Sequence, residues 1–238
     1  RGTATFMVAG DRCTRACRFC AVTTAKPLPL DAGEPARVAE ACARLKLKHV
    51  VITMVARDDL EDGAAAHVAE VVRSIRSLCP DTVQETLTTD FNGSIESLRV
   101  VLEAGAEVFN HNVETVERLT PSVRSRAQYH RSLEVLRRAK EIRPKVITKS
   151  GLMLGLGESE AELLAAFRDL RQAGCDVLTL GQYLQPTLAH LPVVEFISPE
   201  RFSQLRQVAL GLGFLEVFSG PLVRSSYHAD ELKLEGAA

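Results

Sequence analysis

The chain lacks the features that mark membrane-spanning and nucleic-acid-binding proteins. Its 238 residues include no tryptophan, aromatic residues make up 5%, and 29 basic side chains are balanced by 30 acidic ones. The formal net charge of -1 argues against bulk electrostatic binding to nucleic acid or to a membrane surface. No apolar run approaches the roughly 20 residues that a membrane-spanning helix needs, and no signal peptide is expected.

What the chain does contain is an alternation of two patterns. With 46% hydrophobic and 25% charged residues, it can bury a sizeable core in one domain or two small ones. The β-rich runs predict strands over residues 4–10, 49–54, 82–88, 108–113, 145–154, 177–184 and 215–218. The longer amphipathic runs predict helices over 34–45, 65–78, 94–104, 132–143, 160–173 and 199–212. Ser94 is the expected N-cap of the third helix, and Gly105 ends it.

Strands that alternate with helices of this length predict βαβ units and a parallel sheet. Six units and a late strand fall short of a closed eight-unit barrel, which takes about 250 residues. We therefore expect an α/β fold, a partial (β/α)6 TIM-like barrel over 1–214 with a short C-terminal extension over 215–238. Ligands bind such folds at the carboxyl ends of the strands, where this sequence places its polar segments.

Three of the six cysteines lie within eight residues, directly after the first predicted strand. Cys13, Cys17 and Cys20 have C-x3-C-x2-C spacing, and three thiolates can hold three corners of a cubic iron–sulfur cluster. The fourth iron then has no protein ligand, and an open position is typical of a catalytic metal site.

Two alternatives compete with a cluster. A structural zinc site needs four protein ligands, but the nearest histidine, His49, is far along the chain. Unligated thiols are the other alternative, although three in one loop would be prone to oxidation. Cys42, Cys79 and Cys175 occur singly in helical or apolar contexts, where a buried free thiol is expected. Without an export signal, this usage indicates a reducing, cytoplasm-like compartment.

The cysteine spacing, with Phe19 just before the last cysteine, resembles the signature of the radical S-adenosylmethionine superfamily. The resemblance implies a 4Fe–4S cluster on Cys13, Cys17 and Cys20, whose open iron is chelated by S-adenosylmethionine. In that superfamily one electron from the cluster cleaves the sulfonium, and the resulting 5′-deoxyadenosyl radical abstracts a hydrogen atom. The implied fold is a partial (β/α)6 barrel, as the count of predicted units also indicates.

Other segments, in order along nearly the whole chain, resemble the lipoyl synthase family. They include Gly2-Thr3-Ala4-Thr5-Phe6-Met7, Arg57-Asp58-Asp59-Leu60, Asp90-Phe91-Asn92-Gly93, His111-Asn112-Val113-Glu114-Thr115, Arg131-Ser132-Leu133, Thr148-Lys149-Ser150-Gly151, Gly181-Gln182-Tyr183-Leu184-Gln185-Pro186, His190-Leu191-Pro192-Val193 and Gly220-Pro221-Leu222-Val223-Arg224-Ser225-Ser226-Tyr227-His228-Ala229. The last segment is especially specific to this family.

The resemblance implies a sulfurtransferase that inserts two sulfur atoms, at carbons 6 and 8 of an octanoyl chain on a lipoyl carrier domain. A radical is needed because unactivated C–H bonds resist acid–base chemistry. The implied partners are an octanoylated H protein or E2-type subunit of a 2-oxoacid dehydrogenase, and a ferredoxin or flavodoxin-like electron donor. Neither nucleic acid nor a membrane is an expected partner, and no catalytic side chain is expected beyond the cluster ligands.

The family also uses a second, auxiliary 4Fe–4S cluster as its sulfur source. Three cysteines upstream of the Gly2-Thr3 segment hold it, together with a serine of the Arg-Ser-Ser-Tyr segment. Ser225 is the expected ligand, and Ser226 is the alternative. Cys42, Cys79 and Cys175 do not match those three cysteines, so we expect either that the segment carrying them is missing upstream of this sequence or that this chain cannot hold the second cluster.

The glycine-containing run that begins at Gly151 and includes Gly155 resembles the superfamily strand that lies along the adenine. Glycine lets a backbone approach a flat ring closely, although a strand-to-helix turn uses the same residues. Asn112 and Glu114 alternate with Val113 and therefore point to the same side of a strand. An amide and a carboxylate together suit ribose hydroxyls or an ammonium group, and a hydrogen-bonded barrel end is the alternative.

Three charged residues complete the predicted binding set. Lys149 and Arg131 are candidates for the carboxylate of the methionine moiety, with a solvated arginine as the alternative for Arg131. Asp58 follows the second long predicted strand and is included as a cofactor-binding candidate, with a helix N-cap as its alternative. Arg15 and Arg18 are candidates to offset the negative charge of a cluster, with simple solvation as the alternative.

Two rival functions remain at this point. One is another radical S-adenosylmethionine enzyme, either biotin synthase-like or a methylthiotransferase. The other is a noncatalytic iron–sulfur or zinc-binding module. The Arg-Ser-Ser-Tyr-His segment argues against the first, and uptake of iron and sulfide would argue against a zinc module.

Overall fold

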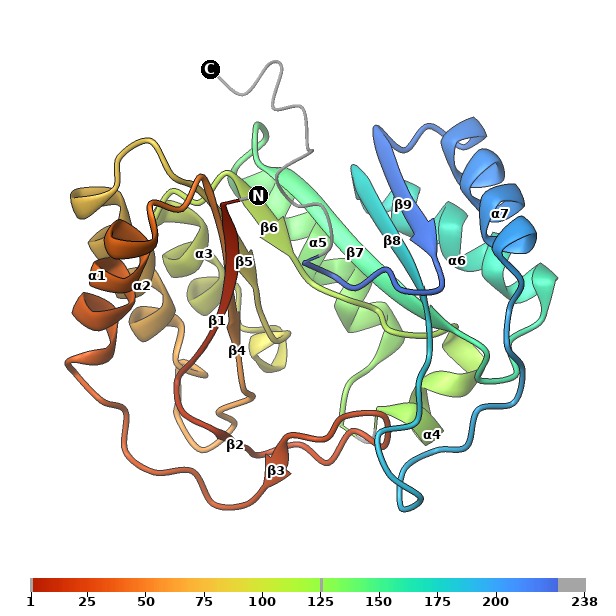
Figure 1. Cartoon of the computed structure of the whole chain (residues 1–238), viewed down its shortest axis with the longest axis horizontal. Coiled ribbons are helices and arrows are strands. Elements are labelled where there is room, and N and C mark those ends of the chain that lie inside the picture. The colour runs from red at the N-terminus through yellow and green to blue at the C-terminus, as the bar shows by residue number, and fades with distance from the viewer. Residues whose placement is uncertain (1, 125, 227–238) are drawn as a thin grey trace.

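The computed structural model describes residues 2–124 and 126–226 and shows an open barrel built on one parallel sheet (Figure 1). Its strand order is β1-β4-β5-β6-β7-β8-β9, and every neighbouring pair runs parallel. The strands are β1 Thr3–Val8, β4 His49–Met54, β5 Val83–Leu87, β6 Val108–Asn110, β7 Ile147–Leu154, β8 Val177–Gln182 and β9 Glu216–Gly220.

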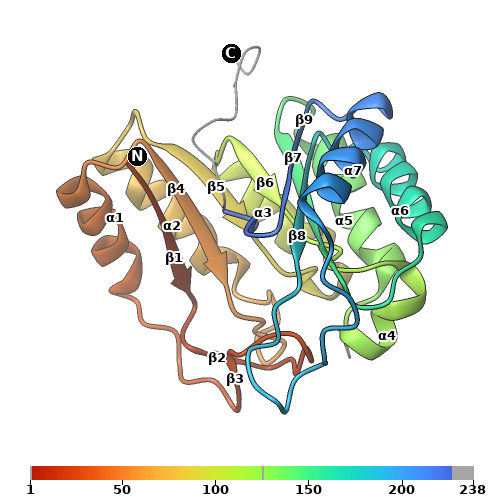
Figure 2. The same cartoon turned by 45° about the vertical axis from the view of Figure 1, so that its right-hand side comes forward.

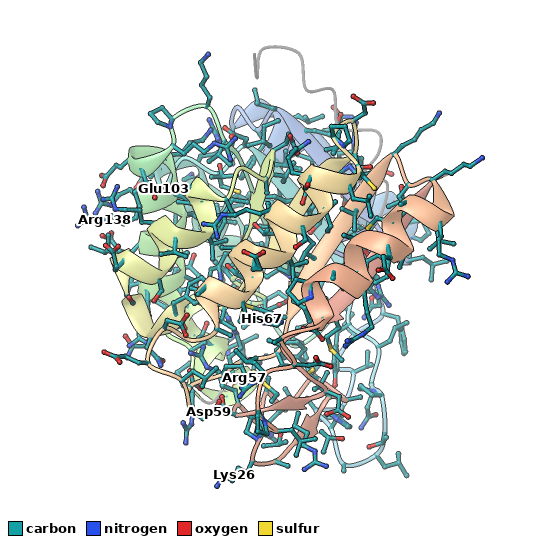
Figure 3. The ribbon with its side chains drawn as sticks, turned by 90° about the vertical axis from the view of Figure 1, so that its left-hand side faces the viewer. Lys26, Arg57, Asp59, His67, Glu103 and Arg138 are labelled. Carbon is teal, nitrogen blue, oxygen red and sulfur yellow. The ribbon has the colours of Figure 1, made fainter. Side chains whose placement is uncertain are left out.

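Six helices cover the outer face of the sheet (Figure 2). They are α1 Glu34–Leu45, α2 Ala65–Leu78, α3 Ile95–Glu103, α5 Tyr129–Ile142, α6 Glu160–Gln172 and α7 Pro199–Gly211. Seen from outside, charged side chains such as Glu103 and Arg138 point away from the sheet (Figure 3). The partial barrel predicted from the alternating pattern is confirmed, and β9 extends its sheet beyond residue 214.

The predicted elements are all present; the bounds of α1, α2 and β4 match the prediction, and those of the others differ by a few residues. Capping residues mark the start of two helices in the sequence. Ser94 caps α3 by accepting a hydrogen bond from the backbone of Ser97, and Ser159 and Glu162 form a capping box on α6. α5 instead begins at Tyr129, earlier than predicted, because the buried Tyr129 ring anchors its first turn and its hydroxyl donates to Asp169.

Five short elements were not predicted. The two-residue strands β2 Arg12–Cys13 and β3 Thr23–Thr24 pair in parallel on either side of the cysteine segment. The 3-10 helices η1 Phe91–Gly93 and η2 Glu117–Leu119 and the four-residue helix α4 Thr120–Val123 lie in loops after strands. Such short pieces have too few residues to show a hydrophobic period.

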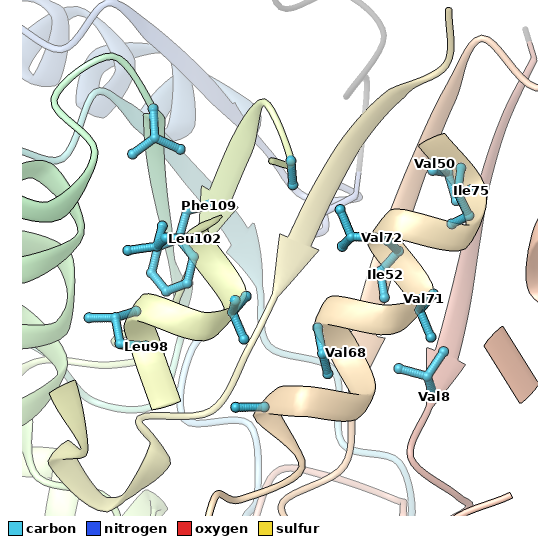
Figure 4. Close-up of a cluster of buried hydrophobic side chains, with 14 of the residues drawn as sticks. Val8, Val50, Ile52, Val68, Val71, Val72, Ile75, Leu98, Leu102 and Phe109 are labelled. Carbon is cyan, nitrogen blue, oxygen red and sulfur yellow. The ribbon is translucent and has the colours of Figure 1, made fainter. Parts of the chain in front are cut away.

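Two apolar clusters fill the space between sheet and helices. The first joins β1, β4 and β6 to α1, α2 and α3, with Val50, Ile52, Ile75 and Phe109 fully buried (Figure 4). The second joins β7, β8 and β9 to α6 and α7, with Phe167 among its buried members. Burying each such side chain stabilises the fold by roughly 1.5–3 kcal/mol. None of the helices within residues 2–124 and 126–226 has the length and apolar character of a membrane span.

The inner face of the sheet is different because it carries polar side chains. Register places Glu85 of β5 beside Val108, Asn110 of β6 beside Lys149 of β7, and Gly151 beside Thr179 of β8. Toward the carboxyl ends of the strands this face opens into a cavity. The fold therefore brings the polar segments that follow the strands to one end of the barrel.

Candidate active site at the carboxyl ends of the strands

The cysteine loop follows β1 and lies across the carboxyl-end side of the barrel (Figure 1). Backbone hydrogen bonds tie it to three other segments: Thr14 N–H donates to Ala56, Arg18 N–H to Val123, and Leu191 N–H to Arg18. The loops after β4, β6 and β8 therefore share in fixing its course.

The three thiols of the loop are half-buried and free. Cys13 Sγ accepts hydrogen bonds from the backbone N–H groups of Arg15 at 3.4 Å and Ala56 at 3.3 Å. Burial raises the pKa of Cys17 to about 11, and the neighbouring Cys13 and Cys20 add to that shift. Metal binding at this loop must therefore displace protons, and the N–H groups on Cys13 suit an iron-bound thiolate.

The loop fits a cluster better than a single ion. Among the described residues, no three His, Cys, Asp or Glu side chains converge as a single metal ion would require. A cubic cluster spreads three thiolates over three separate irons, whereas zinc needs its ligands at one centre. The arrangement gives no support to the zinc alternative.

Arg15, between the first two cysteines, is buried in an acidic pocket. Its Nε donates to Asp58 Oδ2 at 2.9 Å, and its Nη2 donates to Asp58 Oδ1 and Asp90 Oδ1 at 2.7 Å each. Burial opposes its charge, but Asp58 and Asp90 outweigh burial and raise the pKa of Arg15. Simple solvation, the alternative for Arg15, is therefore wrong, because the residue is only 6% exposed.

Asp58 is accordingly an anchor of the cysteine loop. It also accepts a hydrogen bond from Thr14 Oγ1 at 2.9 Å, and its own N–H donates to that hydroxyl at 3.1 Å. Arg131 lies on the same network, with Nη1 3.4 Å from Asp90 Oδ2. Nearby, Arg57 pairs with Asp59 through two 2.9 Å hydrogen bonds and donates to the carbonyl of Ala9 (Figure 3).

Beside the loop lies a cavity of about 330 Å³ at the carboxyl ends of the strands. Its lining includes Cys20 from the loop, Asn112 and Glu114 after β6, Gly151 on β7 and Ser225 from the C-terminal segment. Five of the predicted site residues, separated by as much as 205 positions, thus face one space.

Asn112 and Glu114 form the polar wall of this cavity. Asn112 Nδ2 donates to Glu114 Oε1 at 3.1 Å and to Ser225 Oγ at 3.4 Å, while Asn112 Oδ1 is buried and has no partner among the described residues. Glu114 has a left-handed backbone, φ 67°, which non-glycine residues rarely adopt. Burial raises its pKa, and Arg124 partly offsets that effect. The unpaired Asn112 oxygen and the Glu114 carboxyl group with its raised pKa suit a polar ligand.

Lys149 lies beneath the cavity and does not line it. Its Nζ is 3.0 Å from Glu85 Oε2, both side chains are fully buried, and Asn110 donates to the other Glu85 oxygen at 2.7 Å. Burial pushes the pKa of Glu85 upward, but Lys149 together with the hydrogen bonds from His49 and Asn110 outweighs burial and lowers the pKa. The structure therefore brings Lys149 to the floor of the barrel, where it pairs with a protein carboxylate.

The two predicted glycines have different surroundings. A Cβ on Gly151 would lie 2.5 Å from Thr179 Oγ1 and 3.1 Å from Asn112 Oδ1, so glycine keeps this wall of the cavity flat. Gly155 has φ 96°, and a Cβ there would collide with the carbonyl of Glu195 and the side chain of Gln182. Gly155 is thus needed for contact with the loop that follows β8.

This chain matches the model of the Radical SAM superfamily over residues 7–180. It is 56% identical to the lipoyl synthase of Geobacillus kaustophilus over 237 residues, covering 100% of this chain and 80% of that protein. The chain belongs to the lipoyl synthase family. The lipoyl synthase of Symbiobacterium thermophilum is also 56% identical, over 100% of this chain and 74% of that protein.

Solved structures show the same fold at low sequence identity. Methylornithine synthase superposes with a TM-score of 0.69 at 15% identity, over 97% of this chain and 77% of that one. Coproporphyrinogen III oxidase from Escherichia coli, described as a radical SAM enzyme, has a TM-score of 0.58 at 14% identity, over 89% and 52% of the two chains. The family membership makes this chain a radical S-adenosylmethionine enzyme with a 4Fe–4S cluster, so the reading as a noncatalytic module is wrong.

Sequence reasoning missed several residues of the site. Arg124 is buried and donates from Nη1 to the carbonyls of Asn112 and Val113, and Thr179 and Gly181 line the cavity. Gly181 did carry a signal, because an isolated glycine inside a strand often marks a close backbone approach. Arg124 carried none, since its neighbours along the chain do not show that it is buried.

Proposed function

We propose that Cys13, Cys17 and Cys20 hold the 4Fe–4S cluster and that S-adenosylmethionine occupies the adjoining cavity. The observation that carries this proposal is the position of the half-buried thiols beside a cavity with an unpaired amide oxygen, Asn112 Oδ1. When bound, the cluster supplies the electron that cleaves the sulfonium and so produces the 5′-deoxyadenosyl radical. The buried Arg15 network holds the loop in place for this assembly.

The predicted binding residues divide into two groups by location. Asn112, Glu114 and Gly151 face the cavity and are the proposed contacts to the ligand: the amide and carboxylate for hydroxyl or ammonium groups, the glycine for a flat ring. Asp58, Arg131, Lys149 and Gly155 are engaged with other protein groups. Their proposed part is to hold the cavity walls and the cysteine loop.

The substrate follows from the name of the relatives, lipoyl synthase, and from the need for a radical at unactivated carbon. We propose that the enzyme replaces C–H bonds at carbons 6 and 8 of a carrier-bound octanoyl chain with C–S bonds. The proposed carriers are the H protein and E2-type subunits of 2-oxoacid dehydrogenases, with a ferredoxin or flavodoxin-like donor. The six free cysteines support a reducing, cytoplasmic location.

Ser225 is the proposed protein ligand of the auxiliary cluster that supplies sulfur. Its support is location: Ser225 lines the cavity and accepts a hydrogen bond from Asn112. Ser226 is its neighbour on the same segment, whereas Tyr227, His228 and Ala229 of the family-like run lie outside the described residues. The predicted C-terminal extension over 215–238 contributes β9 to the sheet, and its part after β9 is proposed to reach the sulfur source while the barrel generates the radical.

Anaerobic reconstitution tests the proposal. The protein is given iron and sulfide, then S-adenosylmethionine and dithionite, and 5′-deoxyadenosine is measured by mass spectrometry. We expect about four irons per chain at the three-cysteine site and formation of 5′-deoxyadenosine. Cys17→Ser should abolish both, while the matched control Cys79→Ser, at a thiol outside the site, should retain both. Tetrahedral zinc binding without 5′-deoxyadenosine would contradict the proposal.

A further inference from the structure

The chain reverses direction directly after the last strand. Val223 N–H donates to the carbonyl of Gly220 at 3.1 Å, which closes a β-turn with Pro221 in its second position. The turn sends the chain back across the inner face of the barrel. Val223 is consequently buried, at 6% exposure, and lines the cavity together with Arg224 and Ser225.

The residue under this returning segment is Gly181, on β8. A Cβ on Gly181 would lie well under 3.0 Å from the carbonyl oxygen of Val223 and 3.4 Å from Arg224 Nη1. Real Cβ atoms essentially never approach an oxygen so closely. The backbone of Gly181 is not in the left-handed region, so space and not conformation requires glycine here.

We propose that Gly181 is a positioning residue for Ser225: its missing side chain lets the segment 221–226 lie against β8 and hold the Ser225 hydroxyl at the cavity. This inference rests on the proposed role of Ser225 as a ligand of the auxiliary cluster. A second observation supports it independently. Asn112, which follows β6, donates to Ser225 Oγ, so a second part of the barrel also holds the segment.

A methyl group added at Gly181 should displace either β8 or the returning segment, whichever is held by fewer interactions. β8 is hydrogen-bonded along its length to β7 on one side and β9 on the other. The returning segment is held by the turn bond of Val223, the burial of the Val223 side chain and the single hydrogen bond from Asn112. We therefore expect the segment, and Ser225 with it, to be displaced while the sheet remains intact.

A matched control lies directly beside Gly181. Gly220 is its register partner on β9, and a Cβ there would lie 3.5 Å from Val223 Cγ2, which is ordinary van der Waals contact. The pair Gly181→Ala and Gly220→Ala thus adds the same methyl group at neighbouring positions, and only one of them collides with the segment.

Hydrogen exchange followed by mass spectrometry measures the displacement without any activity. In Gly181→Ala we expect peptides covering 221–226 to exchange about tenfold faster or more, with peptides of β7 and α6 unchanged. Gly220→Ala should exchange like the unsubstituted protein. Unchanged exchange of 221–226 in Gly181→Ala would overturn the proposal, and so would loss of protection throughout the sheet, since the strain would then not be local.

Activity of the holoenzyme separates this inference from the role of Ser225. With both clusters loaded, Gly181→Ala should lower sulfur insertion by about tenfold relative to 5′-deoxyadenosine formation. If the ratio of sulfur insertion to 5′-deoxyadenosine formation is unchanged in both Gly181→Ala and Ser225→Ala, the proposed role of Ser225 is refuted. A ratio lowered in Ser225→Ala but unchanged in Gly181→Ala would overturn only the inference about Gly181.

Discussion

Arg15 and Asp58 join the cysteine loop to the loop after β4 through two parallel hydrogen bonds, 2.9 Å from Nε to Oδ2 and 2.7 Å from Nη2 to Oδ1. The two side chains are 5% and 13% exposed, so water weakens the pair little. Because Arg15 stands between Cys13 and Cys17, this pair fixes the loop before any cluster binds.

Replacing Arg15 should therefore loosen the loop. Arg15→Ala leaves Asp58 without its cationic partner, and we expect it to lower the free energy of unfolding by about 3 kcal/mol. Iron content after reconstitution should fall with it, and urea unfolding and iron analysis measure the two effects. Arg18→Ala, at the exposed arginine of the same loop, is the control. Equal stability of both variants would show that the buried pair does not stabilise the loop.

Lys149 and Glu85, the buried ion pair below the cavity, predict that the stability losses caused by substituting each of them are not additive. Lys149→Met leaves the buried Glu85 carboxylate in the barrel floor without the ammonium group of Lys149, which should cost about 3–5 kcal/mol of stability. Adding Glu85→Gln to it should recover a large part of that loss, because no buried charge then remains. Denaturant unfolding of the two single variants and the double variant measures the coupling. Simple addition of the two losses would contradict a direct ion pair.

The same pair predicts sensitivity to acid. The pKa of Glu85 in the folded protein lies below its ordinary value of 4.5, so the pair's contribution is present above pH 4.5 and is lost as pH falls through the lower, folded value. The double variant Lys149→Met/Glu85→Gln should show a flatter dependence of stability on pH below 4.5. Urea unfolding from pH 5 downward measures it, and parallel curves would contradict the prediction.

The burial of His111 predicts a second pH range over which the stability of the fold changes. Burial lowers its pKa from 6.5 to about 4, with Arg124 adding to the shift, and its ring nitrogens contact the Thr88 carbonyl and the Ser132 hydroxyl at 2.9 Å each. The unfolded chain takes up a proton near pH 6.5 while the folded protein does not, so stability falls as pH drops from 6.5 to 4. The loss is about 3 kcal/mol for this shift.

His111→Gln should remove that slope, whatever it does to stability at neutral pH. His130→Gln is the control, since the His130 side chain is 77% exposed. Unfolding free energies at several values between pH 7 and 4 provide the measurement. A slope that persists in His111→Gln would assign the proton uptake to another group.

Asn112 predicts a selective loss of ligand binding. Asn112→Ala removes both the unpaired Oδ1 and the donor shared by Glu114 and Ser225, so S-adenosylmethionine should bind about 10–100-fold more weakly. Anaerobic calorimetric titration of the cluster-loaded protein measures the Kd. Ser122→Ala, on the exposed side of α4, should bind normally. Unchanged binding by Asn112→Ala would exclude this wall of the cavity as the ligand's contact.

Local patterns made much of the fold predictable. The helices Glu34–Leu45 and Ala65–Leu78 and the strand His49–Met54 have the bounds that their periodicity predicts, because each pattern and its end signals lie within one short segment. Asn112, Glu114, Gly151 and Ser225 were predicted from resemblance and do face one cavity. Their contacts with a ligand stay a prediction.

The sequence by itself determined the alternating barrel and the cysteine loop, since hydrophobic period and cysteine spacing are local properties of a chain. Only the tertiary structure decided which partners the charged and small residues meet. Arg15 finds Asp90 across 75 positions, and Lys149 finds Glu85 across 64. Gly181 is needed because a distant carbonyl, that of Val223, returns over it. The type of a side chain determines which hydrogen bonds and ion pairs it can form, but the packing of the sheet determines with which partner it forms them.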